Sequence, residues 1–239
     1  MKKSLIHAML PAYCVVLTLF LIVGLVSNRI ITVMQENAPI ENRVCAIIDA
    51  GHGGVDGGAS TATGVLESNI NLQIALRLND LMHLLGIKTL MIRTTDISVY
   101  TQGNTIAAKK ISDLRERVRI VNETKNGFLF SIHQNHFPDS RYSGAQVFYG
   151  TDTDSKQFAT NLQTEFIKSL NSGSKRQAKR ANGVYLMQHL QRSGVLVECG
   201  FLSHESESLQ LQSPDYQKKI CCVISTVTSQ YFYEKYTIT

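Results

Sequence analysis

The 239-residue sequence has no tryptophan, only four prolines and 16 glycines, and no dense run of lysine or arginine. So little proline and glycine excludes a collagen-like or linker-dominated chain, and a hydrophobic content of 44% excludes a wholly disordered one. The formal net charge is +5. A nucleic-acid-binding surface requires a concentrated basic patch, so we expect no nucleic-acid partner, although mild basicity suits an anionic polymer.

Common cysteine-based and helical zinc motifs are also missing. The chain contains neither CxxC nor HExxH, and its five cysteines are an odd number: Cys14, Cys45, Cys199, Cys221 and Cys222. We therefore expect neither a disulfide framework nor a cysteine zinc site. The cysteines are interpreted as small buried hydrophobic residues.

Residues 1–27 have the pattern of a signal peptide or membrane anchor. Lys2 and Lys3 precede an uncharged run, Ala8–Val26, whose 19 residues would span roughly 28 Å as a helix, about the hydrocarbon thickness of a bilayer. The basic residues favour a cytoplasmic N-terminus and export of the rest of the chain. No Ala-x-Ala cleavage site follows, which favours a retained anchor over a cleaved signal.

The remaining chain divides into a polar stem, 28–43, and one catalytic domain, 44–236. Apolar runs predict strands at Val44–Asp49, Lys88–Arg93, Phe128–His133, Ala145–Tyr149 and Gly194–Glu198, with another near Tyr185. Helical spacing predicts helices over Ile70–Leu85, from a cap at Asp113 to Lys125, over Phe158–Leu170 and over Pro214–Tyr236. This alternation predicts a single α/β domain with helices flanking a mostly parallel sheet.

Four residues with metal-binding or acid/base chemistry lie beside these predicted elements. His52 follows the first strand in the segment DAGHGG, His133 and Glu198 end later strands, and Glu67 stands where the first long helix begins. Ligands of open α/β folds gather at the carboxyl ends of strands. Two imidazoles, a carboxylate and a water form one ligand set of hydrolytic zinc, and a second carboxylate can protonate a departing amide nitrogen.

Each of these residues also has an ordinary interpretation. A histidine at a strand end is commonly a simple polar group, and Glu67 could stabilise its helix N-terminus electrostatically. Glu198 is harder to explain in this way, because four apolar residues precede it and a buried carboxylate needs a compensating partner. From the residues alone, a metal hydrolase and a binding protein without activity both remain open.

A series of ordered motifs resolves this ambiguity. They are IIDAGHGGVDGGA (Ile47–Ala59), GVLESNINL (Gly64–Leu72), LRERVRIVN (Leu114–Asn122), FSIHQNH (Phe130–His136) and LVECGFLS (Leu196–Ser203). In these motifs and their intervals, the chain from about Val44 to Tyr231 resembles the zinc-dependent N-acetylmuramoyl-L-alanine amidases of type 3. That resemblance implies a six-stranded sheet with flanking helices and hydrolysis of the amide between the muramic acid lactyl group and L-Ala of peptidoglycan stem peptides.

The resemblance also assigns residues. It implies one zinc ion held by His52, Glu67 and His133, with Glu198 as the catalytic acid/base that takes a proton from water and passes it to the leaving amine. The rival interpretations are a zinc peptidase that cuts within the stem peptide and an inactive membrane-anchored wall-binding scaffold.

The short, anchored, single-domain build is similar to the germination-specific sporulation amidases of this family. It implies a role in spore cortex maturation through muramic-δ-lactam formation, with a polysaccharide deacetylase acting downstream or a protein activator as partner. The expected location is outside the cytoplasmic membrane, in the cell wall or at the membrane around the forespore. A vegetative wall amidase is the alternative.

Overall fold

The computed structural model describes Thr18 and residues 44–236. The predicted signal or anchor, 1–27, lies outside the described residues except for Thr18, and the predicted stem, 28–43, lies wholly outside them. A compact unit begins at Val44. Among the described helices, none is both long and apolar enough to cross a bilayer.

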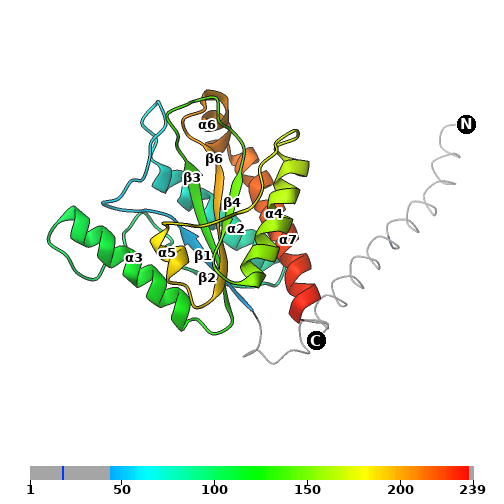
Figure 1. The fold of residues 1–239 in the computed structure, drawn as a ribbon, viewed down its shortest axis with the longest axis horizontal. Coiled ribbons are helices and arrows are strands. Elements are labelled where there is room, and N and C mark those ends of the chain that lie inside the picture. The colour runs from blue at the N-terminus through cyan, green and yellow to red at the C-terminus, as the bar shows by residue number, and fades with distance from the viewer. Residues whose placement is uncertain (1–17, 19–43, 237–239) are drawn as a thin grey trace, which may run out of the picture. The chain divides into compact units, whose positions relative to one another are not determined.

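A six-stranded sheet forms the centre of this unit (Figure 1). In chain order its strands are β1 (Cys45–Ala50), β2 (Lys88–Met91), β3 (Gly127–Asn135), β4 (Gln146–Tyr149), β5 (Lys179–Arg180) and β6 (Ser193–Phe201). Their order across the sheet is β2-β1-β3-β6-β4-β5, and every pair is parallel except β4–β6. The predicted α/β class and mostly parallel sheet are confirmed.

Helices cover both faces of the sheet, which explains why its central strands are so apolar. One face packs against α2 (Glu67–Leu84), α4 (Thr153–Ser169) and α7 (Pro214–Tyr236), and its core includes Phe128, Phe130 and Val197. The opposite face packs against α3 (Ile106–Glu123) and α5 (Tyr185–Gln188) through alternate strand residues. The seven-residue α6 (Glu205–Leu211) follows β6.

Two predicted elements differ in the structure. The helix expected from Asp113 begins at Ile106, where the side chain of Thr105 accepts a hydrogen bond from the Ala108 amide, so Thr105 is the cap. Asp113 lies inside this helix and accepts instead from the amide of Val99. The segment at Tyr185 is a short helix rather than a strand.

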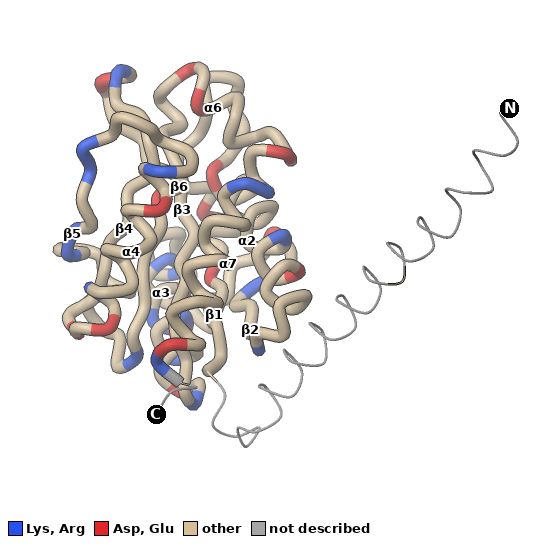
Figure 2. Tube along the Cα trace, turned by 90° about the vertical axis from the view of Figure 1, so that its right-hand side faces the viewer, with Lys and Arg blue, Asp and Glu red and all other residues tan. Residues whose placement is uncertain are grey.

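Other sequence expectations need smaller corrections. The strand expected to end at Glu198 continues to Phe201, so Glu198 lies within β6. Three cysteines are buried as predicted, namely Cys45, Cys199 and Cys221, but Cys222 is exposed. Cys14 lies outside the described residues. In the view of Figure 2, basic and acidic residues are interspersed along the chain, in agreement with the dispersed charge of the sequence.

Candidate metal centre and active site

The turn after β1 holds His52 in an uncommon backbone conformation. His52 has φ of +61°, in the left-handed region that non-glycine residues seldom occupy, and Gly53 follows with φ of +131°. The neighbouring Gly51 is also required, because a Cβ there would lie 2.2 Å from ring atoms of His133. The turn thus brings the imidazole after β1 against the imidazole on β3, with ring centroids 5.0 Å apart.

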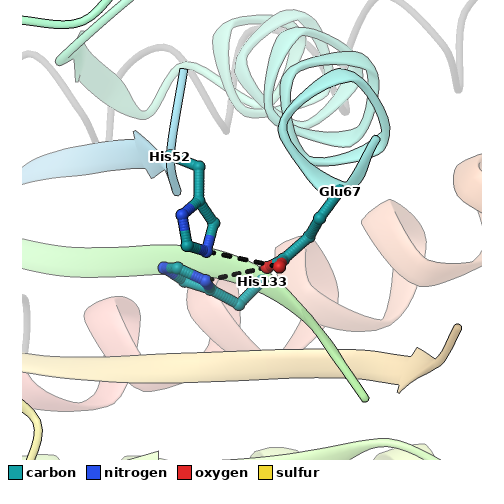
Figure 3. Close-up of side chains that lie close together, drawn as sticks. All are labelled: His52, Glu67 and His133. Carbon is teal, nitrogen blue, oxygen red and sulfur yellow. Dashed lines mark hydrogen bonds and ion pairs between the residues drawn. The ribbon is translucent and has the colours of Figure 1, made fainter. Parts of the chain in front are cut away.

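Glu67, the first residue of α2, points its carboxylate between these two rings (Figure 3). Its Oε2 lies 3.3 Å from Nε2 of His52, and its Oε1 lies 3.0 Å from Nδ1 of His133. One ligand atom from each of the three residues lies within 4.8 Å of the other two. The structure therefore brings together His52, Glu67 and His133 as a candidate metal centre.

The ionised carboxylate of Glu67 suits a divalent cation, whereas the imidazole of His52 must lose its proton to bind one. Burial raises the pKa of Glu67, but hydrogen bonds and charge from His133 and His52 outweigh it and hold this pKa well below its usual range, so the carboxylate is ionised. Burial lowers the pKa of His52, but the hydrogen bonds and charges of Glu67 and Asp56 outweigh burial and raise this pKa to about 9. Two imidazole nitrogens and an ionised carboxylate oxygen are a donor set that zinc prefers. Because a bound cation would replace the imidazole proton of His52, metal affinity should fall as the pH drops below about 9.

Glu198 lies beside this cluster on the neighbouring strand. His133 and Glu198 are register partners in the parallel β3–β6 ladder, so their side chains project from the same face of the sheet. Oε2 of Glu198 is buried and has no hydrogen-bond partner among the described residues. Burial raises the pKa of Glu198 to about 7, with His133 opposing the shift and Glu67 adding to it. A carboxyl group with a free oxygen and such a pKa is able to exchange a proton near neutral pH.

Comparison with known proteins identifies the family. Residues 46–227 match the family described as N-acetylmuramoyl-L-alanine amidase, Amidase_3. The chain belongs to this family. It is 37% identical, over 79% of each chain, to the germination-specific N-acetylmuramoyl-L-alanine amidase of Bacillus subtilis.

Solved structures agree with this assignment. The CwlD amidase of Clostridioides difficile, solved in complex with the GerS lipoprotein, superimposes with a TM-score of 0.77 at 34% identity, covering 81% of this chain and 100% of that one. An N-acetylmuramoyl-L-alanine amidase of Clostridium difficile 630 gives a TM-score of 0.69 at 27% identity, with coverage of 81% and 99%. The expectation of an amidase of this family is confirmed.

Two buried arginines of this amidase secure the turn that carries His52. Arg93 is 2% exposed and donates to the carbonyls of Ala50, Gly51 and Ser68 at 2.8–3.1 Å. Arg117, also 2% exposed, donates to the His52 carbonyl at 2.7 Å. The carbonyls of Gly51 and His52 are thus both held by buried donors, so the surrounding structure can maintain the left-handed conformation of His52.

Arg117 also neutralises another buried carboxylate, that of Asp49. Arg117 forms an ion pair with Asp49, which is 1% exposed and accepts a further hydrogen bond from Ser131 at 2.7 Å. Burial raises the pKa of Asp49, but the charge of Arg117 and the Ser131 hydroxyl outweigh it and hold the pKa below its ordinary value.

The sequence analysis identified the three clustered residues and Glu198 but missed these supporting residues. Arg117 stands four residues after Asp113 within a helical motif, a spacing that places both on one face and could have signalled their ion pair. The sequence did not mark Arg93 as buried, because three of its four carbonyl partners lie 25 to 43 residues away and only Thr95 is near in the chain.

A cleft of about 940 Å³ opens on the same side of the strands as their carboxyl ends. Its walls come from three segments: 60–63, between His52 and Glu67 in the chain, 136–140, just after His133, and 202–212, just after Glu198. Apolar side chains such as Phe137 and Leu202 share its lining with hydroxyl, amide and imidazole groups and the carboxylate of Glu205, and no lysine or arginine of the described residues lies there.

Proposed function

We propose that this amidase is a zinc enzyme of spore cortex maturation that hydrolyses the bond between the muramic acid lactyl group and L-Ala. The observation that carries the proposal is the grouping of two imidazoles and one carboxylate within 4.8 Å, with Glu198 in register beside His133. Three protein ligands leave a coordination position for water or substrate, as in catalytic rather than structural zinc sites.

His52, Glu67 and His133 would hold the ion. When bound, zinc supplies Lewis-acid polarisation of a substrate carbonyl and a more acidic water molecule. Glu198 takes the proton from the attacking water on its unpartnered oxygen. It then donates that proton to the amine of L-Ala as the carbon–nitrogen bond breaks, because an amine leaves readily only when protonated. The products are a lactyl carboxylate on the glycan and a free stem peptide.

Similarity supports the spore role. The Bacillus subtilis relative is named for germination, and the chain resembles it over most of both sequences. We also propose that the enzyme acts outside the cytoplasmic membrane, in the wall around the forespore, and is held there by its N-terminal segment, because Lys2 and Lys3 precede the uncharged run Ala8–Val26. Because the CwlD structure contains the GerS lipoprotein, a lipoprotein is the protein partner we propose. A polysaccharide deacetylase would act next on the stripped glycan.

Digestion of purified peptidoglycan tests the reaction. We expect new N-terminal L-Ala and no other new amino terminus. Termini from within the stem peptide would instead indicate a peptidase, and complete absence of turnover with the zinc-loaded protein and a lipoprotein partner would indicate an inactive wall-binding scaffold.

Muropeptide analysis of spores tests the physiological role. A strain that lacks the gene should form spores without muramic-δ-lactam, and the wild-type gene should restore it. Unchanged muramic-δ-lactam together with a defect in separating vegetative cells would support the alternative of a vegetative wall amidase.

A further inference from the structure

Asn71 occupies an unusual position in α2. It lies one turn after Glu67, and its side chain is completely buried. Nδ2 donates to the Gly51 carbonyl at 3.1 Å and to Oε1 of Glu67 at 3.2 Å, and Oδ1 accepts from Nε2 of Gln134 at 3.1 Å. Both Nδ2 hydrogens and the amide oxygen are therefore in use, as a fully buried amide requires.

The three partners of Asn71 belong to the three segments of the candidate metal centre. Gly51 immediately precedes His52, Glu67 is itself in the cluster, and Gln134 immediately follows His133. Gln134 contributes a second link, because its backbone amide donates to Oε1 of Glu67 at 3.1 Å. One amide side chain thus connects elements that are far apart in the sequence and that must converge on one ion.

The contact with Gly51 has a particular consequence for His52. The peptide group whose carbonyl is held by Asn71 leads directly into the left-handed residue, and Arg93 donates to the same carbonyl at 3.1 Å. Left-handed backbone at a non-glycine residue costs free energy and persists only where its surroundings oppose relaxation. Loss of the Asn71 contact would allow the turn, and the His52 ring with it, to relax away from the cluster.

We infer that Asn71 is a positioning residue that sets the affinity of the metal centre for its ion by fixing the segments of His52, Glu67 and His133 relative to one another. This inference rests on the proposed zinc site. Asn71 does not ligate the ion or touch the reacting atoms; it acts through Glu67, the Gly51 carbonyl and Gln134. Groups that orient metal ligands in this way typically change metal affinity about 10- to 100-fold when removed.

Gln163 provides a matched control. It is also a buried amide on a helix with three hydrogen bonds, two accepted by Oε1 from the Val147 amide and Gln146 Nε2, and one donated to the Ala145 carbonyl. All its partners lie at the start of β4, and none belongs to a segment that carries His52, Glu67 or His133. A purely structural role for both amides would give the two substitutions the same consequences.

The experiment compares Asn71→Leu with Gln163→Leu in the full chain. Zinc affinity is measured by competition with a chromophoric chelator, the ligand field by the visible spectrum of the cobalt-substituted protein, and folding by thermal melting of the metal-free protein. Both variants should melt at lower temperature than wild type. Only Asn71→Leu should bind zinc about 10- to 100-fold more weakly and show an altered cobalt spectrum.

Gln134→Met is a milder second variant that removes the side-chain bond to Asn71 but keeps the backbone bond to Glu67. It should weaken zinc binding by less than Asn71→Leu, and it carries the test if Asn71→Leu does not fold. Wild-type zinc affinity in the folded variants, or an equal loss in Gln163→Leu, would overturn the inference while leaving the proposed zinc site intact. Failure of the wild-type chain to bind zinc would overturn both.

Discussion

The two glutamates of the candidate active site, Glu67 and Glu198, have opposite surroundings. Glu67 accepts hydrogen bonds from the Ala59 amide, the Asn71 side chain and the Gln134 amide, in addition to its contacts with both imidazoles. Glu198, on the neighbouring strand, has a buried oxygen without a partner. The pKa of Glu67 is accordingly held well below its usual range, whereas burial raises that of Glu198 to about 7.

This difference matches the two roles that we propose for the two glutamates. A carboxylate that must remain ionised and stationary as a metal ligand is surrounded by donors that stabilise its charge and fix its orientation. A carboxylate that must accept and release a proton is left without such donors, so that its neutral and charged forms are closer in free energy. The proposed ligand and acid/base roles therefore follow from the surroundings of each glutamate and not from the residue type.

Replacement of Glu67 should have the largest effect. In Glu67→Ala we expect loss of zinc binding together with reduction of amidase activity to the background level, because one of three protein ligands is gone. Metal content after dialysis and release of N-terminal L-Ala measure the two effects. Glu165→Ala, which removes a glutamate of α4 that pairs with Lys168 on the surface, should retain both. Retained zinc with lost activity in Glu67→Ala would contradict a ligand role.

Replacement of Glu198 should lower amidase turnover without lowering zinc affinity. Glu198→Gln keeps the size of the side chain but removes its proton-accepting oxygen, so turnover should fall about 10²- to 10⁴-fold. Zinc affinity should stay close to that of wild type, since Glu198 is not a ligand. Steady-state rates and zinc titration of the same preparation make the measurement. A variant that loses zinc as readily as Glu67→Ala would erase the distinction between the two glutamates.

The buried carboxylate of Asp49 extends the comparison to a residue neutralised by an ion pair. Arg117→Met leaves Asp49 buried without its cation, which should lower the free energy of unfolding by about 3–5 kcal/mol at pH 7. Urea denaturation of the metal-free protein measures the loss. An unfolding free energy equal to that of wild type would show that the pair makes no net contribution.

The loss of unfolding free energy in Arg117→Met should also depend on pH, which is a smaller and more specific effect. In wild type the folded-state pKa of Asp49 lies below the unfolded value, so its contribution is complete above about pH 4 and is lost as pH falls through the folded pKa. In Arg117→Met, burial without the cation raises the pKa of Asp49. Protonation of Asp49 as pH falls then removes the cost of a buried unpaired charge, so the variant is destabilised less. The stability difference should therefore narrow between pH 7 and pH 4. A constant difference would exclude Asp49 as its source.

Predictions from the sequence were most accurate where local patterns carry the signal. The apolar run that became β1 and the helical spacing of α2 and α7 lie close to their expected positions. The start of α3 was missed because Asp113 resembles a cap, whereas its carboxylate is used by Val99 and Arg117. The segment at Tyr185 was misassigned because four residues are too few to show a period.

The residues of the candidate active site likewise divide into those that the sequence identified and those that it did not. His52, Glu67, His133 and Glu198 were recognisable from motif and spacing, since each follows or begins a predictable element. Asn71 lies within the motif GVLESNINL and Arg93 ends a predicted strand, but neither was assigned a role, because most of their partners come from segments distant in the sequence.

The sequence by itself determined the α/β class, the mostly parallel sheet and the four residues with the necessary chemistry, because hydrophobic periodicity and motif order are local properties of the chain. Only the tertiary structure decided that three of them converge within 4.8 Å and that one glutamate is saturated with donors while the other keeps an oxygen free. Convergence and burial depend on strand order and on contacts across more than 60 residues, so they exist only once the chain has folded.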